Sequence, residues 1–162
     1  MKSGEMSNSQ TTALADLSQS LACPMNLLRL TDKGLYCPAG GFYIDPWTRV
    51  DRALVTHAHS DHAVPGSRHY LACQAGEHIL TKRLGPMGRK SFLRYGESKT
   101  VNGVRVSFHP AGHVLGSSQI RLEYRGHVWV VTGDYKLQSD PTCAPFEPVS
   151  YTHLTLPTKC WV

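Results

Sequence analysis

The chain carries a loop, residues 57–62, that reads His-Ala-His-Ser-Asp-His and holds three imidazoles and one carboxylate. This loop directly follows the apolar run Ala53-Leu54-Val55, which has the pattern of a short buried strand. A strand that ends in a loop directs alternate side chains to one point, so His57 and His59 can face one metal ion. A helix does not explain the spacing, because positions i, i+2 and i+5 do not share a helix face. We therefore expect a fold in which a buried strand leads straight into a metal-binding loop.

Further candidate ligands complete this set. A catalytic zinc ion uses about three protein ligands and a water molecule, and a two-metal site also needs a carboxylate that can bridge. Asp61 and His62, on the turn of the loop, can reach a second ion. His113 and Asp134 each follow a glycine just after a strand-like run, and glycine lets the backbone turn sharply there. The alternative is a polar loop in which histidines gather by chance.

The remaining pattern predicts a β-rich chain with interspersed helices. The expected strands are Leu27–Leu30, Leu35–Cys37, Gly41–Ile44, Arg52–Thr56, Tyr70–Cys73, Val104–Phe108, Gln119–Tyr124 and His127–Thr132. The last two form a hairpin around Arg125-Gly126. A helix is expected at Gly76–Leu84, which ends at Gly85-Pro86.

Length and composition indicate one soluble domain with a proper core, since the chain has 162 residues and 41% of them are apolar. No apolar run is long enough to span a membrane, and the polar residues 1–20 carry no secretory signal and read as a flexible tail. The five cysteines are scattered and include no Cys-x-x-Cys pair. This favours free thiols and a cytoplasmic location.

The formal net charge is +5, and basic residues gather at Lys82-Arg83, Arg89-Lys90 and Arg94. Such a run is commonly a solvated face, but it can also follow a phosphate backbone. Charge alone leaves both interpretations open.

Three motifs in this order give the chain a specific resemblance: the histidine loop, Ala-Gly-His-Val-Leu-Gly-Ser at 111–117 and Thr-Gly-Asp at 132–134. The chain resembles the nucleic-acid-processing branch of the metallo-β-lactamase fold superfamily. It is most similar there to bacterial DNA ligase-associated exonucleases, which are related to an mRNA 3′-end processing factor. The resemblance covers residues 26–148 and includes residues 38–46 and 133–136. It implies an α/β fold, the N-terminal half of a metallo-β-lactamase αββα sandwich, formed by residues 21–148.

The resemblance also implies a role for each candidate residue. The first metal would be held by His57, His59 and His113, the second by Asp61 and His62, with Asp134 as the bridge. The ions would be two Zn²⁺, with Mn²⁺ as the alternative, and Asp61 and Asp134 would be catalytic. Asp45 resembles an acid that orients the histidine loop, although it could also be a turn former before Pro46.

The function implied is hydrolysis of a DNA or RNA phosphodiester by hydroxide activated between two zinc ions. The resemblance also implies exonuclease-like action in DNA repair or end processing. It implies an ATP-dependent DNA ligase as partner and no membrane association. Lys136 could contact the phosphate backbone or be an ordinary surface lysine. The alternatives are a hydrolase of the same superfamily that acts on a thioester, lactone or β-lactam, and a non-catalytic nucleic-acid-binding protein with a vestigial metal site.

The chain departs from this family in its length, because the family has a longer domain with an inserted cap and a further histidine for the second metal. Residues 149–162 instead resemble a string found at the ends of unrelated truncated reading frames. We therefore expect this tail to be non-native and His153 and Cys160 to have no chemical role. Whether the fragment is active by itself is left open.

Overall fold

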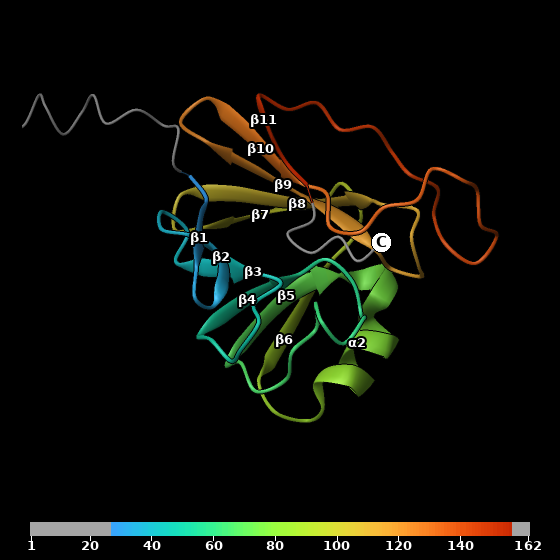
Figure 1. The fold of residues 1–162 in the computed structure, drawn as a ribbon, viewed down its shortest axis with the longest axis horizontal. Coiled ribbons are helices and arrows are strands. Elements are labelled where there is room, and N and C mark those ends of the chain that lie inside the picture. The colour runs from blue at the N-terminus through green and yellow to red at the C-terminus, as the bar shows by residue number, and fades with distance from the viewer. Residues whose placement is uncertain (1–26, 157–162) are drawn as a thin grey trace, which may run out of the picture.

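Two β-sheets face each other in the computed structural model, which describes residues 27–156 (Figure 1). The first sheet has the strand order β1-β2-β3-β4-β5-β6 and the second β11-β10-β9-β8-β7. The first sheet consists of β1 (Arg29–Thr31), β2 (Gly34–Cys37), β3 (Phe42–Ile44), β4 (Arg52–Val55), β5 (His69–Cys73) and β6 (Arg89–Leu93). The second consists of β7 (Ser98–Val101), β8 (Val104–Pro110), β9 (Ser118–Tyr124), β10 (His127–Val131) and β11 (His153–Thr155).

The pairing direction in the first sheet determines where the histidine loop lies. β1, β2 and β3 pair antiparallel, whereas β3, β4, β5 and β6 are all parallel. Parallel strands place their carboxyl ends at one edge of a sheet. The loop that follows β4 therefore lies at the same edge as the residues that follow β3.

The second sheet is antiparallel except for its parallel β10–β11 pair. The β9–β10 hairpin turns through Arg125 and Gly126, both of which have positive φ angles, of 49° and 80°. Positive φ at both central residues is the signature of a two-residue type I′ turn, whose twist matches that of the strands. The hairpin predicted around these two residues is confirmed.

The larger core cluster lies between the two sheets. Phe42 and Leu54 come from the first sheet, and Phe108, Ile120 and Leu122 come from the second. Burial of apolar surface between the sheets is the main force that holds them together. A second cluster covers the other face of the first sheet, where α2 (Glu77–Leu84) follows the short 3₁₀ helix η2 (Gln74–Gly76).

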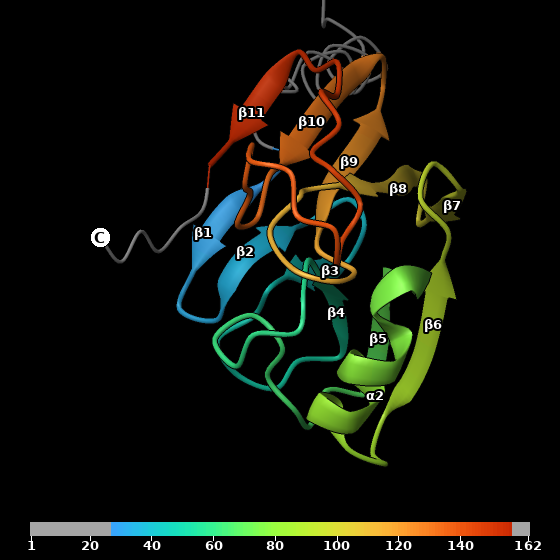
Figure 2. The ribbon, with the colours of Figure 1, turned by 90° about the vertical axis from the view of Figure 1, so that its right-hand side faces the viewer.

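Helix α2 packs through Leu80 and Leu84 against Val55 and Ala72 of the first sheet. Figure 2 shows the helix lying across this sheet in front of β5. It ends where Gly85 adopts a φ of 72°, as the Gly-Pro signal predicted. The α/β fold class is confirmed, and α2 is the only α-helix within residues 27–156.

The predicted strands all have counterparts, with shifts of one or two residues at some ends. The predicted strand Leu27–Leu30 is observed at Arg29–Thr31. Strands β6 and β7 were not predicted, because Arg89–Leu93 and Ser98–Val101 contain charged or hydroxyl side chains. Both lie at a sheet edge, where polar side chains are favoured because they discourage unwanted pairing. Their pairing depends on neighbours that no local pattern reveals.

The domain boundaries remain predictions. Residues 1–20 and Cys160 lie outside the described residues. His153–Thr155 of the proposed non-native tail pair with β10, and this pairing does not test their origin. Cys37, Cys73 and Cys143 are free thiols, as expected. No helix in the described part of the chain is long and apolar enough to cross a membrane.

The inter-sheet core yields a stability prediction. Phe108→Ala removes a side chain from a residue that is 0% exposed and leaves a cavity between the sheets. We expect the free energy of unfolding to fall by about 3–5 kcal/mol, measured by urea denaturation followed by circular dichroism. Leu137→Ala is the control, because Leu137 is 72% exposed, and should change stability by less than about 0.5 kcal/mol. Equal effects of the two substitutions would contradict the assigned core.

Candidate metal centre

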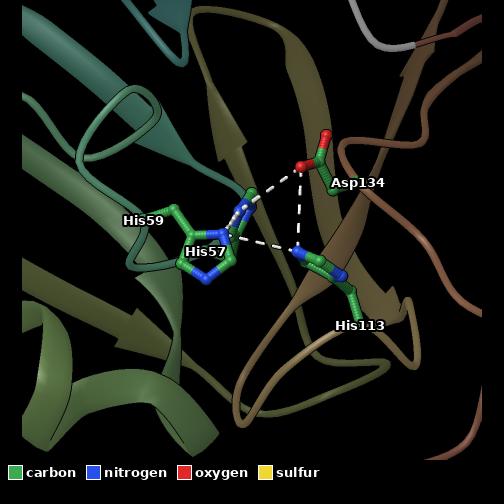
Figure 3. A group of neighbouring side chains, drawn as sticks. All are labelled: His57, His59, His113 and Asp134. Carbon is green, nitrogen blue, oxygen red and sulfur yellow. Dashed lines mark hydrogen bonds and ion pairs between the residues drawn. The ribbon is translucent and has the colours of Figure 1, made fainter. Parts of the chain in front are cut away.

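Four side chains from three separate segments converge at the carboxyl edge of the first sheet (Figure 3). His57 and His59 come from the loop after β4, His113 from the connection between β8 and β9, and Asp134 from the segment after β10. One ligand atom from each residue lies within 4.8 Å of the other three. Both sheets therefore contribute to the group.

The distances fit a single divalent ion. Nδ1 of His59 lies 3.0 Å from Nε2 of His57 and 3.4 Å from Nε2 of His113. Oδ2 of Asp134 lies 3.9 Å from Nε2 of His57 and 3.7 Å from Nε2 of His113. Zinc–nitrogen bonds of about 2.0–2.1 Å in a tetrahedron separate ligand atoms by roughly 3.3 Å. Small side-chain movements bring the four atoms to this spacing, so the group could hold a metal ion.

Asp61 and His62 lie on the other side of Asp134. Nε2 of His62 is 3.5 Å from Oδ2 of Asp61 and 3.7 Å from Oδ1 of Asp134. The two oxygens of Asp134 thus face different groups: Oδ2 faces Nε2 of His57 and of His113, and Oδ1 faces Nε2 of His62. The structure groups His57, His59, His113 and Asp134 and places His62 and Asp61 next to Asp134 along a chain of close contacts; the bridging role of Asp134 stays a prediction.

Asp45 anchors the histidine loop from the end of β3. Its Oδ1 accepts a hydrogen bond of 2.8 Å from the backbone N–H of Thr56. Its Oδ2 accepts one of 2.6 Å from the Thr56 hydroxyl and lies 2.7 Å from Nδ1 of His62. Asp45 has a φ of 44°, a left-handed conformation that is uncommon outside glycine. The proposed turn-forming role and the orienting role therefore coexist in one residue.

Thr56 extends this network to His57, and its role was missed in the sequence. The Thr56 hydroxyl donates its proton to Asp45, so it accepts at the 3.1 Å contact with Nδ1 of His57. Nδ1 of His57 then carries the proton and Nε2 presents its lone pair to the cluster. The same logic applies to His62, whose Nδ1 donates to Asp45 and leaves Nε2 free. The only sequence signal for Thr56 is a hydroxyl at the end of an apolar strand.

Burial keeps two of the histidines neutral. The pKa of His57 is lowered from 6.5 to about 3, first by burial and then by the neighbouring His62. Burial also lowers the pKa of His113, and His59 and His62 add to this while Asp134 opposes it. A neutral imidazole is the form that binds a metal ion. Both residues are therefore in the ligating form at neutral pH.

His62 differs from the other histidines because it contacts carboxylates. Burial acts to lower its pKa, but the hydrogen bond and charge of Asp45, with the charges of Asp134 and Asp61, outweigh burial and raise it. His62 therefore holds a proton more readily than His57. A divalent ion at Nε2 of His62 would compete with that proton, so binding of an ion there would be stronger at higher pH.

Two glycines let the second sheet reach the site. Gly133 precedes Asp134 with a φ of 56°, and a Cβ there would lie 2.8 Å from the side chain of Thr56. Gly112 precedes His113 with a φ of 72°, and its Cβ would lie 2.3 Å from the carbonyl oxygen of Lys136. Both positions require glycine for conformation and for space.

Two serines hold the same connection in place. The Ser117 hydroxyl accepts hydrogen bonds of 3.0 and 3.2 Å from the backbone N–H groups of His113 and Val114. The Ser118 hydroxyl and backbone N–H both donate to the carbonyl oxygen of Thr56, each at 2.9 Å. The second of these serines ties the start of β9 to the end of β4, and so fixes the two sheets relative to each other at the site.

The basic residues singled out in the sequence do not form one surface. The Arg83 guanidinium donates to the carbonyl oxygen of Ala58 at 3.2 Å, beside the histidine loop. Arg89 and Lys90 lie at the amino end of β6, the opposite edge of the sheet. Lys136 lies 3.5 Å from Asp140. The basic run, for which the sequence left both a solvated face and a phosphate-following surface open, is thus divided between two edges.

Comparison with known proteins gives partial matches. No protein-family model matches the chain. Over 115 residues, 69% of its length, the chain is 35% identical to an Opitutus terrae protein named "Probable DNA ligase", of which it spans 11%. Over 48 residues, 30% of its length, it is 35% identical to "Endoribonuclease ysh-1" of Neurospora crassa, of which it spans 6%. The chain therefore spans a small part of each of these relatives.

Solved structures match the chain at low sequence identity. The E377D mutant of CmlA β-hydroxylase matches 84% of this chain and 38% of its own with a TM-score of 0.54 at 15% identity. A metallo-β-lactamase from Cronobacter sakazakii matches 62% of this chain and 46% of its own, with a TM-score of 0.45 at 15% identity. The chain shares the fold of the first of these structures, and its two facing sheets with α2 agree with the predicted α/β sandwich. The described residues form an α/β sandwich fragment of this fold, with the candidate ligands at one edge.

Removal of the Asp45 carboxylate tests how the loop is held. Asp45→Ala leaves Thr56 and His62 without their common acceptor. We expect zinc affinity, measured by competition with a chromogenic chelator, to fall about 10–100-fold. Asp32→Ala is the control, because Asp32 is an exposed acid in the β1–β2 turn. A loss of equal size in both variants would contradict the anchoring role.

The buried His57 predicts a pH dependence for the metal-free chain. Below pH 6.5 the unfolded chain protonates this imidazole, whereas the folded chain does so only near pH 3. Protons therefore favour the unfolded state in this window, and stability falls as the pH falls. The raised pKa of His62 stabilises the folded chain, and this stabilisation is lost only as the pH rises above 6.5. Measurements below pH 6.5 therefore isolate the effect of the buried His57.

In EDTA, we expect the free energy of unfolding to fall by about 1–2 kcal/mol between pH 6.5 and 5. Urea denaturation at each pH measures it. His57→Gln should remove most of this slope, with a residual part from His113, whose lowered pKa acts in the same direction. A slope that is unchanged in the variant would show that His57 is not the titrating group.

Proposed function

We propose that the protein to which this chain belongs is a metal-dependent hydrolase that cleaves nucleic-acid phosphodiester bonds. The observation that carries the proposal is the placement of Asp134, whose two oxygens face two groups of ligands. His57, His59 and His113 would hold one ion, and Asp61 with His62 the other. Two divalent ions, Zn²⁺ or Mn²⁺, would supply activation of water and stabilisation of charge on both oxygens of an in-line displacement.

The chain's own residues prepare this chemistry. Asp45 and Thr56 fix the orientation of His57 and His62, so that no reorganisation is needed when ions and substrate arrive. Asp61 is 45% exposed at its side chain, so its outer face can position a water molecule and accept a proton. The buried Thr56–His57 pair excludes water from the inner side of the cluster. The reaction would therefore take place on the open side, beside Asp61.

The names of the matched relatives support a nucleic-acid substrate. One relative is named an endoribonuclease, and another is named a DNA ligase of which this chain would form only a small part. Similarity to a short segment of a ligase-named protein supports DNA as the substrate. It also supports an exonuclease-like role in end processing or repair, with a DNA ligase as partner. We extend the proposal to a cytoplasmic location, in keeping with the free thiols of Cys37, Cys73 and Cys143.

The test uses the complete gene product that contains this chain. Labelled single-stranded DNA, duplex DNA and RNA are incubated with it, and a chromogenic β-lactam is assayed in parallel. We expect cleavage of nucleic acid that is lost in EDTA and restored by Zn²⁺ or Mn²⁺. Turnover of the lactam without cleavage of nucleic acid would favour the small-molecule alternative, and salt-sensitive binding without cleavage a non-catalytic binding protein.

Substitutions separate the site from the rest of the surface. Asp134→Asn and His59→Gln should each lower cleavage by at least about 100-fold, because an ion held this way supplies several kcal/mol. His78→Gln is the matched control, since His78 is an exposed imidazole on α2, and should retain full activity. Cleavage that survives complete metal removal would overturn the proposal.

A further inference from the structure

A second concave site lies at the edge of the sandwich opposite the metal centre. A cavity of ≈ 430 Å³ opens there between the first sheet and β7. Its lining includes four side chains with basic nitrogens: Arg52, His69, Arg89 and Lys99. They come from the amino-terminal halves of β4, β5 and β6 and from the facing strand β7. None of the six proposed metal ligands lines this cavity.

Strand register places three of these side chains in one row. Arg52 pairs directly with His69, and His69 with Arg89. Side chains two residues apart share a face of a strand. Arg52 therefore faces the same way as Leu54, and His69 the same way as Leu71, into the core between the sheets. The row is the last layer of the inter-sheet space before solvent.

Lys99 meets this row from the other sheet. It pairs with Val106 of β8, and Val106 is part of the inter-sheet core. Directly paired residues lie on the same face of a sheet, so Lys99 also points between the sheets. The four basic groups thus surround one space rather than spreading over a convex surface.

The cavity has no neutralising group of its own, because its lining contains no aspartate or glutamate. Asp51 lies nearby, with carboxylate oxygens 3.8 Å from Nε of Arg52 and 3.9 Å from Nδ1 of His69. Within residues 27–156, no ion pair of Arg89 or Lys99 is present. Arg52 and Arg89 lie on strands separated only by β5, roughly 10 Å apart at about 4.8 Å per strand. Together with Lys99 they place like charges around one space, and these charges repel one another. An anion bound between them relieves this repulsion.

The basic lining continues beyond the cavity. A second hollow of ≈ 420 Å³ shares His69 with the first and adds Arg49 and Arg68 to its lining. The side chain of Arg68 is 80% exposed. A ligand with several linked negative groups can contact both hollows, whereas a single small anion occupies one.

We propose that this edge binds a polyphosphate-type anion, the chemistry shared by the phosphates of a nucleotide and the backbone of a nucleic acid. The arginine guanidiniums match phosphate oxygens in geometry and charge. The site is separate from the metal centre: His57 lies five positions after Arg52 along β4 and its end, a span of roughly 16 Å at about 3.3 Å per residue. Binding here therefore does not require metal ions.

The test uses the 162-residue chain in EDTA at low ionic strength, titrated with inorganic tripolyphosphate in a calorimeter. We expect saturable binding that perturbs the imidazole NMR signals of His69 and weakens as salt is added. Arg89→Gln should weaken binding about five- to tenfold, which corresponds to the loss of one partly exposed charge-assisted hydrogen bond. Arg89→Gln combined with Lys99→Gln should abolish it.

Controls separate binding from folding. Lys33→Gln removes an exposed charge from the β1–β2 turn, away from the cavity, and should leave affinity unchanged. Arg89→Lys keeps the charge and should retain most of the affinity. Arg89→Gln should not lower the free energy of unfolding, because it relieves repulsion, whereas a purely structural arginine would lower it.

A competing oligonucleotide identifies the source of the phosphates. Displacement of tripolyphosphate by single-stranded DNA assigns the site to the nucleic-acid backbone, and failure to displace assigns it to a small phosphate ligand. Either result supports an anion site. Absence of saturable binding, or equal affinity in the wild-type chain and the double variant, overturns the proposal.

Discussion

The candidate centre depends on the carboxylate of Asp45. Its three hydrogen bonds join the end of β3 to Thr56 at the end of β4 and to His62 on the loop. The left-handed backbone of Asp45 costs on the order of 1–3 kcal/mol, and these charge-assisted bonds offset that cost. Through Thr56, the same carboxylate sets which nitrogen of His57 carries the proton. The positions of His57 and His62, and the ring nitrogen that carries the proton in each, thus follow from one partly buried acid.

The candidate ligands could be picked out in the sequence because each follows a strand, and strand ends can be recognised from local apolar patterns. The role of Thr56 could not, because it depends on the parallel pairing of β3 with β4. Strand β6 was missed for the same reason: it is a charged edge strand, and its pairing with β5 leaves no pattern in the local sequence. The sequence also could not show that the basic residues are dispersed: Arg83 and Arg89 are close in sequence, but the Arg83 guanidinium lies beside the histidine loop and Arg89 lies at the opposite edge of the sheet.

The centre forms only when both sheets are in place. His57 comes from the first sheet and His113 from the second, and the bonds from Ser118 to the carbonyl of Thr56 join the two at the site. The core around Phe108 holds the sheets in contact. Ion binding at such a site favours the folded state, because the ligands are brought together only there. Packing between the sheets and affinity for metal are therefore coupled.

The charge of the candidate metal centre determines whether an anionic ligand can approach it before metal ions are bound. Three carboxylates, Asp45, Asp61 and Asp134, lie around His62, while burial keeps His57 and His113 neutral at pH 7. The three carboxylates outnumber His62, the one histidine of this group whose pKa is raised, so the metal-free ligand cluster itself carries negative charge. It repels an anionic ligand even though the chain as a whole has a formal charge of +5. Each divalent ion adds two positive charges and reverses this balance. Under the proposed function, metal ions would therefore have to bind before a phosphodiester could. The basic residues at the far edge could not replace the ions, because they lie beyond the screening length of physiological salt, about 8 Å.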